Sequence, residues 1–342
     1  MARPPGRPLV VISDSNVAPL YAAPLLRRLV RGGVEAHLET FPAGEAHKTR
    51  ETKADLEDRL FRLGIGRDAA IVAVGGGVTG DLAGFTAATW HRGIPVVQAP
   101  TTVLAMCDAA LGGKTGVDLP GGKNLVGAFH APRAIYADVA TLATLPDADF
   151  RGGFAEVVKS AVIADVELFR WLEDSAPALV RRDPTAVQDA IARSLRIKAR
   201  VVARDEREAG RRVVLNFGHT VAHAIEAASG YGISHGDAVA IGMMVEGHLA
   251  IAATGFPAVG VERLRRVLQS FGLPVGWPGD LGLEDVVAAA RHDKKSRAGR
   301  NRYALPARIG TMPRGPDVTR EVDESSLAEA CRHLRTGADD AD

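Results

Sequence analysis

Short runs of apolar, β-branched residues alternate with helical stretches in the first part of the chain. Such runs are typical of strands that are buried on both faces of a parallel sheet. The sequence predicts strands at 9–13, 34–41, 69–74, 94–99 and 134–138. Helical periods at 25–30 and 50–63 separate the first three of these strands. The resulting β-α-β-α-β order predicts a parallel α/β sheet.

The pattern changes near Pro146. Beyond this residue, strand-like runs largely stop and apolar residues recur with the period of amphipathic helices. The sequence predicts helices at 151–164, 167–181, 184–203, 219–229, 238–253, 261–271 and 284–291. We therefore expect two domains, an α/β domain at residues 1–146 and a mainly α-helical domain at residues 147–342.

Composition and charge exclude several classes of protein. The 342 residues are 46% hydrophobic and 24% charged, which is ordinary for a globular protein with a sizeable core. A formal net charge of +1 gives no global field that would recruit nucleic acid or a membrane. The sequence shows neither an apolar run of spanning length nor a start with the form of a signal peptide. Because Cys107 and Cys331 cannot form a disulfide framework, we expect a cytoplasmic protein.

A glycine-rich loop follows the predicted strand at 69–74. Residues 75–84 match G-x-G-x-x-G between a strand and a helix, where backbone N–H groups and the helix N-terminus can hold a pyrophosphate. The acidic residue that ordinarily binds the ribose about twenty residues further on is absent, because Val97 and Gln98 stand there. The candidate replacements, each equally well explained as a solvated loop charge, are Asp14, Glu45 and Lys48.

A second glycine-rich stretch contains two lysines. Lys114 stands in the run GGKTG and Lys123 in the run GGKN. Lysines in such loops can reach phosphate as point charges, because little side-chain bulk surrounds them. The spacing of a Walker motif is absent, so a P-loop is not expected.

Three of the ten histidines lie within residues 219–235. His219 and His223 are four residues apart and share one helix face, and His235 follows a glycine-containing break from which it can fold back beside them. Imidazole suits Zn²⁺, and a catalytic zinc ordinarily takes three protein ligands and leaves one position open. One histidine alone would be better explained as an ordinary helix residue, whereas three favour a metal site. Zinc-protease chemistry is not expected, because the spacing lacks the internal glutamate.

Glu156 and Lys159 share one face of the predicted helix at 151–164 and have apolar neighbours. A surface ion pair is the common explanation for this spacing. A buried glutamate would require a partner, and a metal ion would serve as one. Among the other basic residues, Lys198 and Arg212 are distinguished because they flank the histidine stretch in the sequence.

Together these motifs resemble those of the 3-dehydroquinate synthases, which belong to the sugar-phosphate cyclase superfamily. The resemblance runs from about Val10 to Gly310. Its motifs are Gly75–Gly84, Arg92-Gly93, Pro100–Thr102, Asp108–Phe129, Ala155–Lys159, Asp205-Glu206 with Glu208, Asn216–Glu226, His235–Met243 and Asp293-Lys294-Lys295. The resemblance implies a Rossmann-like NAD-binding N-terminal domain and a mainly α-helical C-terminal domain that holds Zn²⁺ or Co²⁺, with the active site between them.

The resemblance also implies a role for each matching residue. The metal ligands would be Glu156, His219 and His235. NAD would contact Asp14, Asn16, Glu45, Lys48, Gly76, Gly77, Val78, Thr79, Gly80, Asp81, Thr101, Thr102, Lys114, Lys123, Thr141 and Thr144. The substrate would contact Asp108, Lys114, Asn124, Lys159, Lys198, Arg212, Asn216 and His223, with Arg92 contributed by a second subunit and Lys294 or Lys295 closing the site.

The implied reaction converts 3-deoxy-D-arabino-heptulosonate 7-phosphate to 3-dehydroquinate and phosphate, a carbon–oxygen lyase step of the shikimate pathway. NAD would be reduced and reoxidised in each turnover, while the metal polarises substrate hydroxyls. The resemblance also implies a homodimer whose ligand is a small phosphorylated sugar acid, with no nucleic acid or membrane as partner.

Several alternatives remain open. Asp118, Ala222 and Asp237 differ from the residues usual in the family, so a sister cyclase that makes 2-deoxy-scyllo-inosose, 2-epi-5-epi-valiolone or amino-dehydroquinate is the main alternative. An NAD- and metal-dependent polyol or glycerol-phosphate dehydrogenase would share the architecture but consume NAD. A non-catalytic NAD-binding protein would be expected to lack some of the proposed metal ligands, and none is lost.

Overall fold

The computed structural model describes residues 7–120, 122–208, 210–291, 301–315 and 317–336. The chain divides into two compact units, Met1–Leu145 and Pro146–Asp342. The first unit contains a parallel sheet covered by helices, and the second is mainly helical. The predicted fold class, an α/β domain followed by a mainly α-helical domain, is therefore confirmed.

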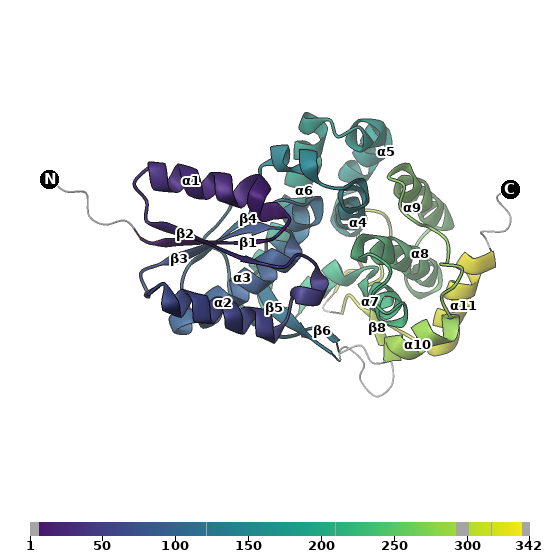
Figure 1. Ribbon diagram of the computed structural model, residues 1–342. Helices are drawn as coiled ribbons and strands as arrows, with labels where there is room; N and C mark the ends of the chain where they lie inside the picture. The colour runs from purple at the N-terminus through teal and green to yellow at the C-terminus, as the bar shows by residue number, and fades with distance from the viewer. Residues whose placement is uncertain (1–6, 121, 209, 292–300, 316, 337–342) are drawn as a thin grey trace. The chain divides into compact units, whose positions relative to one another are not determined.

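The first unit is built on a five-stranded parallel sheet with the strand order β2-β1-β3-β4-β7 (Figure 1). Its strands are β1 (Leu9–Asp14), β2 (Ala36–Phe41), β3 (Ala70–Gly75), β4 (Val96–Pro100) and β7 (Ala134–Ile135). Its helices and short helical turns are η1 (Ala18–Ala22), α1 (Ala23–Arg31), η2 (Glu45–His47), α2 (Arg50–Arg62), α3 (Gly77–Thr89), η3 (Trp90–Arg92), η4 (Ala105–Ala109) and η5 (Val139–Thr144).

Helices cover both faces of this sheet, with α1 on one side and α2 and α3 on the other (Figure 1). Val10 and Ile12 of β1 pack in the same buried cluster as Leu56 of α2 and Leu82 of α3. Val11, which points to the opposite face, packs with residues of η1 and α1. Because successive side chains of a strand alternate between faces, a strand covered on both sides must be apolar throughout. This explains why the apolar runs located the strands.

An antiparallel hairpin replaces the loops that were predicted around the two lysines. Its strands are β5 (Lys114–Leu119) and β6 (Gly122–Phe129). The loop prediction was wrong for the residues from Lys114 onward, because Gly116 and Gly127 permit close strand contact, whereas Gly112 and Gly113 before β5 do adopt positive φ, 109° and 68°. A Cβ atom at Gly116 would lie 2.7 Å from the carbonyl oxygen of Val126, and one at Gly127 would overlap the backbone of Thr115.

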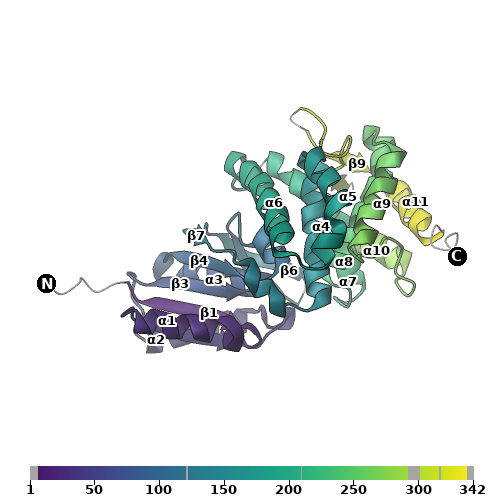
Figure 2. The same cartoon turned by 90° about the horizontal axis from the view of Figure 1, so that it is seen from above.

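The second unit is a bundle of helices with a small antiparallel pair of strands (Figures 1 and 2). Its elements are α4 (Asp147–Ala164), α5 (Val166–Val180), α6 (Pro184–Arg204), η6 (Arg211–Asn216), α7 (His219–Ala228), α8 (His235–Thr254), α9 (Ala258–Ser270), α10 (Leu283–Arg291), β8 (Asn301–Tyr303), β9 (Arg320–Val322) and α11 (Glu324–Thr336). The sequence pattern did not predict β8, β9 or α11.

Helix α8 is the core of the second unit and packs against α4, α7, α9 and α11. Within the described part of the chain it is the one helix that is long and apolar enough to cross a membrane by length and composition. Because 72% of that apolar window is buried inside the protein, packing against other helices accounts for its composition.

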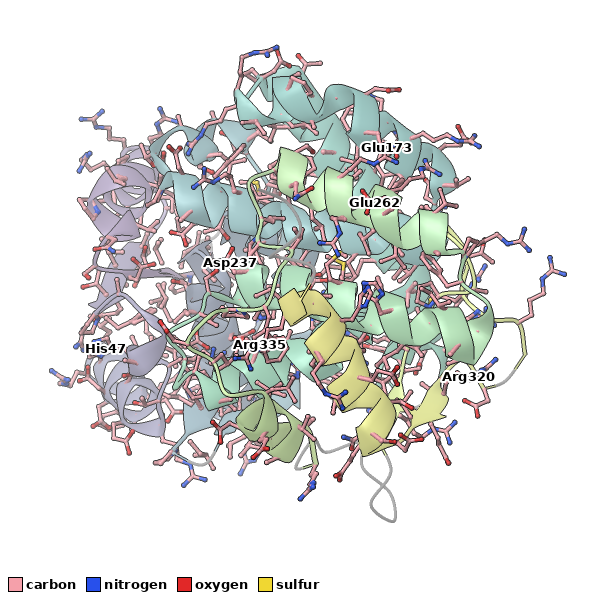
Figure 3. All side chains as sticks on the ribbon, turned by 90° about the vertical axis from the view of Figure 1, so that its right-hand side faces the viewer. His47, Glu173, Asp237, Glu262, Arg320 and Arg335 are labelled. Carbon is pink, nitrogen blue, oxygen red and sulfur yellow. The ribbon has the colours of Figure 1, made fainter. Side chains whose placement is uncertain are left out.

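A polar contact joins two other helices of this unit. Arg263 of α9 donates two hydrogen bonds to Glu173 of α5, which is labelled in Figure 3.

Candidate functional site

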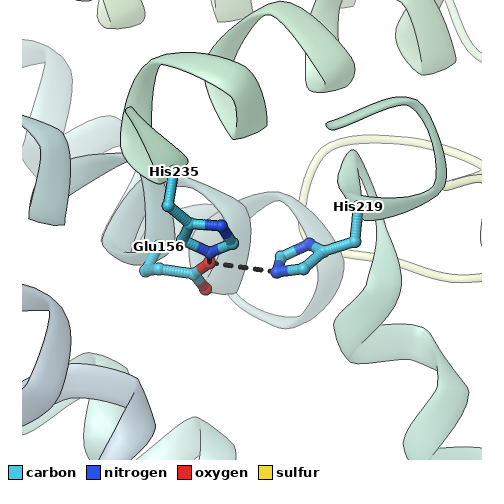
Figure 4. Close-up of side chains that lie close together, drawn as sticks. All are labelled: Glu156, His219 and His235. Atoms are coloured by element: carbon cyan, nitrogen blue, oxygen red, sulfur yellow. Dashed lines mark ion pairs between the residues drawn. The ribbon is translucent and has the colours of Figure 1, made fainter. Parts of the chain in front are cut away.

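Glu156, His219 and His235 come together in the second unit (Figure 4). Nε2 of His219 lies 3.2 Å from Oε1 of Glu156, and Nε2 of His235 lies 3.6 Å from the same oxygen. One ligand atom from each residue lies within 4.8 Å of the others. The three come from α4, the first residue of α7 and the first residue of α8. Two imidazole nitrogens and one carboxylate oxygen facing a common point are a donor set that suits Zn²⁺ or Co²⁺.

A buried carboxylate holds His219 in place by capping its helix. Gly218, which precedes α7, has a φ of 82°, a left-handed conformation that favours glycine and supplies no side-chain cap. Glu246 of α8 caps the helix instead, accepting hydrogen bonds from the backbone N–H groups of Gly218 at 2.7 Å and Val221 at 3.2 Å. The first turn of α7 is thereby tied to α8, the helix that carries His235.

A close helix crossing places His235 beside Glu156. Ser234 is the N-cap of α8, and its hydroxyl accepts a backbone N–H from the first turn. Gly236 packs directly on Gly152 of α4, and a Cβ atom at Gly236 would lie 2.5 Å from the Cα atom of Gly152. The absence of a side chain at Gly236 lets α4 and α8 approach at the level of the cluster.

The environment of Glu156 fits a bound cation. Glu156 and Lys159 are each 1% exposed and form an ion pair, so the explanation as a surface pair is wrong. Nevertheless, neither carboxylate oxygen of Glu156 accepts a hydrogen bond of normal geometry from the described residues. A buried carboxylate without such partners is costly. A divalent ion held by Glu156, His219 and His235 would satisfy it.

The protonation states at the cluster are set by burial and by charge. Burial raises the pKa of Glu156, but the charge of Lys159 and the contacts with His219 and His235 outweigh burial and hold this pKa well below its usual value. Burial lowers the pKa of His219, which favours the neutral imidazole that a metal requires. Burial also lowers the pKa of His235, but hydrogen bonding to Glu156 and Glu226 outweighs it and raises this pKa to about 9. Metal binding would therefore have to displace a proton from His235.

The predicted substrate residues of the second unit lie on elements that pack against one another. Lys159 is on α4, Lys198 on α6 and Arg212 on η6, and these three elements are in mutual contact. Arg212 is 2% exposed and Lys198 is also buried, so neither is the ordinary surface residue that was the alternative. The ring of His223 lies 5.7 Å from that of His219, which confirms that the two share one face of α7.

Hydrogen bonds fix the segment that carries Arg212. Its backbone N–H donates to Asp205 at 2.8 Å, and its guanidinium donates to the carbonyl oxygen of Glu206. Asn216 donates from its side-chain amide to Glu208 at 2.9 Å. Glu208 belongs to one of the matching motifs, but no separate role was predicted for it.

In the first unit, the glycine-rich loop lies at the carboxyl edge of the sheet. β3 ends at Gly75, and α3 begins at Gly77. The hydroxyl of Thr79 donates to Asp14 at 3.0 Å, and Asp14 in turn accepts the backbone N–H of Asn16 at 3.0 Å. The carboxyl edge of a parallel sheet is where such folds bind nucleotides. The loop, the end of β1 and the start of α3 are thus brought together as the sequence predicted.

A buried lysine with three carboxylates lies in the same unit. Nζ of Lys48 is 3.0 Å from Asp81, 3.4 Å from Glu45 and 3.7 Å from Asp118. Because Lys48 is buried, its explanation as a solvated loop charge is wrong. Burial lowers the pKa of Lys48, but the carboxylates outweigh it and the pKa is raised. Burial raises the pKa of Asp81 to about 6 despite the charge of Lys48. Lys123 extends this network, 3.8 Å from Glu45.

The other predicted residues of the first unit are more dispersed. The backbone N–H of Thr101 donates to Gly75, and the Thr102 hydroxyl caps the next turn. Thr141 and Thr144 both meet the hydroxyl of Tyr21. The remaining ones lie as follows: Gly76, Gly77, Val78 and Gly80 in the loop and start of α3, Arg92 in η3, Asp108 in η4, Lys114 at the start of β5, and Asn124 in β6. Lys294 and Lys295 lie outside the described residues. The contacts that each residue was predicted to make with NAD or substrate stay predictions.

Comparison with known proteins assigns the family. Residues 38–152 match the family described as 3-dehydroquinate synthase N-terminal, and residues 153–296 match 3-dehydroquinate synthase C-terminal. A 3-dehydroquinate synthase of Xylella fastidiosa (strain 9a5c) is 48% identical over 332 residues, which are 95% of this chain and 83% of that protein.

Two solved structures share the fold of the whole chain. A 2-deoxy-scyllo-inosose synthase complexed with carbaglucose-6-phosphate, NAD⁺ and Co²⁺ has a TM-score of 0.89 at 29% identity, covering 98% of this chain and 92% of that one. ValA, the 2-epi-5-epi-valiolone synthase of Streptomyces hygroscopicus subsp. jinggangensis 5008 with NAD⁺ and Zn²⁺ bound, has a TM-score of 0.87 at 30% identity, covering 96% and 91%. Because both domain families match and the relative from Xylella fastidiosa is 48% identical over 95% of the chain, the chain belongs to the 3-dehydroquinate synthase family.

Proposed function

We propose that this protein converts 3-deoxy-D-arabino-heptulosonate 7-phosphate to 3-dehydroquinate and phosphate, using catalytic NAD and Zn²⁺ or Co²⁺. The observation that carries the proposal is the convergence of Glu156, His219 and His235 on one point, with a buried carboxylate whose oxygens lack well-aligned hydrogen bonds from the part of the chain that the structure describes. The family and the 48% identity to a relative named 3-dehydroquinate synthase supply the reaction. The product places the enzyme in aromatic amino acid biosynthesis.

The cofactors follow from the donor set and from the relatives. Two similar enzymes were solved with NAD⁺ and with Zn²⁺ or Co²⁺, and this chain has a cluster of matching chemistry. When bound, the metal ion supplies Lewis-acid polarisation of substrate oxygens, and NAD supplies a reversible acceptor for hydride. In the first unit, Asp14 and the loop after β3 would hold the dinucleotide, with Lys48 and its carboxylates beside them.

The chain's own residues would bind and orient the substrate. The guanidinium of Arg212 can meet a carboxylate through two parallel hydrogen bonds, which suits it to the acid group of the heptulosonate. Lys159 and Lys198 carry buried point charges that attract anionic groups. His223 lies one turn along α7 from His219 and would contact a substrate held at the metal. Fixing a flexible sugar acid at several charged points lowers the entropic part of the barrier.

A sister cyclase is the second candidate, because the two solved structures described above, at 29% and 30% identity, are enzymes of that kind. The three departures from the family pattern have local explanations that leave the metal ligands untouched. Asp118 pairs with Lys48 and accepts the backbone N–H of Asn124, Ala222 is buried in α7, and Asp237 bonds the cap residue Ser234. The higher identity to 3-dehydroquinate synthase and the buried Arg212 favour the first candidate.

We also propose a cytoplasmic homodimer in which a second subunit supplies Arg92. His91 and Arg92 both adopt left-handed backbone conformations, with φ of 48° and 67°. Such conformations cost about 1–3 kcal/mol each and persist only where the surrounding structure fixes them. A defined direction for Arg92 is what a contribution to a neighbouring site would need.

The hydride balance tests the proposed reaction against a dehydrogenase. With substrate in large excess over NAD, we expect phosphate release to continue far beyond the amount of NAD while the NADH absorbance stays low. The physical reason is that the hydride removed from the substrate is returned to it within the same turnover. The measurement follows phosphate and NADH in parallel in one reaction. Accumulation of NADH in proportion to substrate consumed would instead establish a dehydrogenase.

A further inference from the structure

Both ring nitrogens of each histidine in the cluster face an oxygen atom. In each ring Nε2 faces Glu156, at 3.2 Å for His219 and 3.6 Å for His235. Nδ1 of His219 lies 3.2 Å from the backbone carbonyl oxygen of Phe217. Nδ1 of His235 lies 3.5 Å from Oε1 of Glu226, a buried carboxylate. One histidine is thus paired with a neutral backbone group and the other with a charged side chain.

Glu226 reaches His235 from a neighbouring helix. It lies seven residues after His219 on α7, so the two side chains share a helix face, with His223 between them. His235 begins α8, which packs against α7. Helix α7 therefore carries one proposed ligand, His219, and a carboxylate that faces the other, His235.

We propose that Glu226 is a positioning residue for the metal site. Its carboxylate would accept the Nδ1–H of His235, which selects the tautomer that leaves the Nε2 lone pair for a metal ion and sets the orientation of the ring. This inference rests on the proposed metal site, because it assigns Glu226 to the support of one of its three ligands. The assignment gives a role to the last residue of the motif that contains both His219 and His223.

His235 needs such support more than His219 does. The side chain of His235 is 34% exposed, against 12% for His219, so packing restricts its ring less. A carboxylate partner also makes the imidazole a stronger ligand than a carbonyl partner does. The carboxylates of Glu226 and Glu156 together would place two negative charges near a divalent ion. These charges would offset the positive charge of the buried Lys159.

Two of the contacts that end helix α7 are made by the backbone of Glu226. Its backbone carbonyl oxygen accepts the N–H of Tyr231 at 2.7 Å and the hydroxyl of Ser229 at 3.1 Å. These bonds survive any substitution of the side chain. A change of the Glu226 side chain therefore tests metal binding while these two backbone contacts of the helix end remain available.

Two substitutions at Glu226 separate charge from hydrogen bonding. Glu226→Gln keeps the shape and an acceptor oxygen, whereas Glu226→Leu keeps bulk and removes the acceptor. Loss of such a partner lowers metal affinity about 10- to 100-fold, so we expect a shift in that range for Leu and a smaller one for Gln. The dissociation constant of Zn²⁺ is measured by competition with a chelating dye on the full chain. The absorption spectrum of the Co²⁺-loaded proteins reports the ligand geometry, and it should change for Leu.

Asp237→Asn is the matched control, because it removes a negative charge two residues from His235 while its carboxylate bonds Ser234. We expect it to bind Zn²⁺ as the wild type does. Wild-type affinity and an unchanged Co²⁺ spectrum in Glu226→Leu would overturn the inference, as would an equal loss in Asp237→Asn. If Glu226→Leu does not fold, the test rests on Glu226→Gln alone. Wild-type Zn²⁺ affinity in Glu226→Gln would then overturn the inference. A wild-type protein without Zn²⁺ affinity would refute the proposed metal site instead.

Discussion

Glu156→Gln is expected to lose its metal and its activity together. Glutamine keeps the shape of the side chain but removes the one anionic ligand of the cluster. The buried Lys159 then loses the carboxylate it is paired with, and its charge opposes the entry of a cation. Polarisation by a bound metal is worth several kcal/mol, which corresponds to a fall in kcat of roughly a thousand-fold or more. Metal content is measured on the purified protein by elemental analysis, and turnover by phosphate release.

The matched control is Glu173→Gln on α5 of the same unit. Glu173 is also paired with a basic residue, Arg263, but it lies on the outer helices and takes no part in the cluster. This variant should keep its metal and a near-normal rate. Removing one partner of a buried ion pair costs about 3–5 kcal/mol, so thermal unfolding must show that Glu156→Gln is folded at the assay temperature. A folded Glu156→Gln protein with full metal content and normal turnover would contradict the metal site.

Arg212→Ala is expected to lose most of its activity without losing its metal. If Arg212 holds the substrate carboxylate, its removal leaves that group without its partner in the complex. Loss of one partner of a buried charged pair costs about 2–5 kcal/mol. At about 1.4 kcal/mol for each factor of ten, kcat/KM should fall between roughly thirty-fold and several thousand-fold. Steady-state kinetics on the heptulosonate phosphate measure the change, while Zn²⁺ content and NAD affinity should remain as in the wild type.

The neighbouring Arg211 provides the control for this variant. It is exposed, and its guanidinium lies 3.5 Å from a carbonyl oxygen of the chain, so Arg211→Ala removes an equal charge from the same turn. We expect Arg211→Ala to work at close to the wild-type rate. An Arg212→Ala enzyme that is as fast as Arg211→Ala would remove the carboxylate role and favour a sister cyclase.

The sequence predicted those elements whose burial follows directly from local pattern. The strands at 9–13 and 69–74 are covered on both faces, so their apolar runs were unambiguous. Helix α8 was predicted from residue 238 but begins at His235, because Ser234 acts as its N-cap, a signal that the sequence already contained. The hairpin β5–β6 was missed because glycines needed for close strand contact also mark loops.

The site was predictable as far as chemistry-bearing residues clustered in the sequence. The grouping of His219 with His223 and the return of His235 followed from spacing. The helix cap that Glu246 provides could not be predicted from spacing. Glu246 lies 28 residues from Gly218, whose backbone N–H it accepts, and only the fold brings the two together. The burial of Lys48 could not be predicted from the sequence. A lysine in a polar turn has the same local sequence pattern whether carboxylate partners or solvent surround it. Sequence distance therefore limited what could be foreseen.

One measurement tests the central claim most directly. The purified wild-type protein, loaded with Zn²⁺ and given a trace of NAD, is offered 3-deoxy-D-arabino-heptulosonate 7-phosphate and, separately, sedoheptulose 7-phosphate, and the products are identified by mass spectrometry and NMR. We predict that 3-dehydroquinate and phosphate form in equal amounts from the first substrate, and that the second, which has no carboxylate for Arg212, reacts far more slowly. Equal rates on the two substrates, or a cyclic product other than 3-dehydroquinate, would contradict the account.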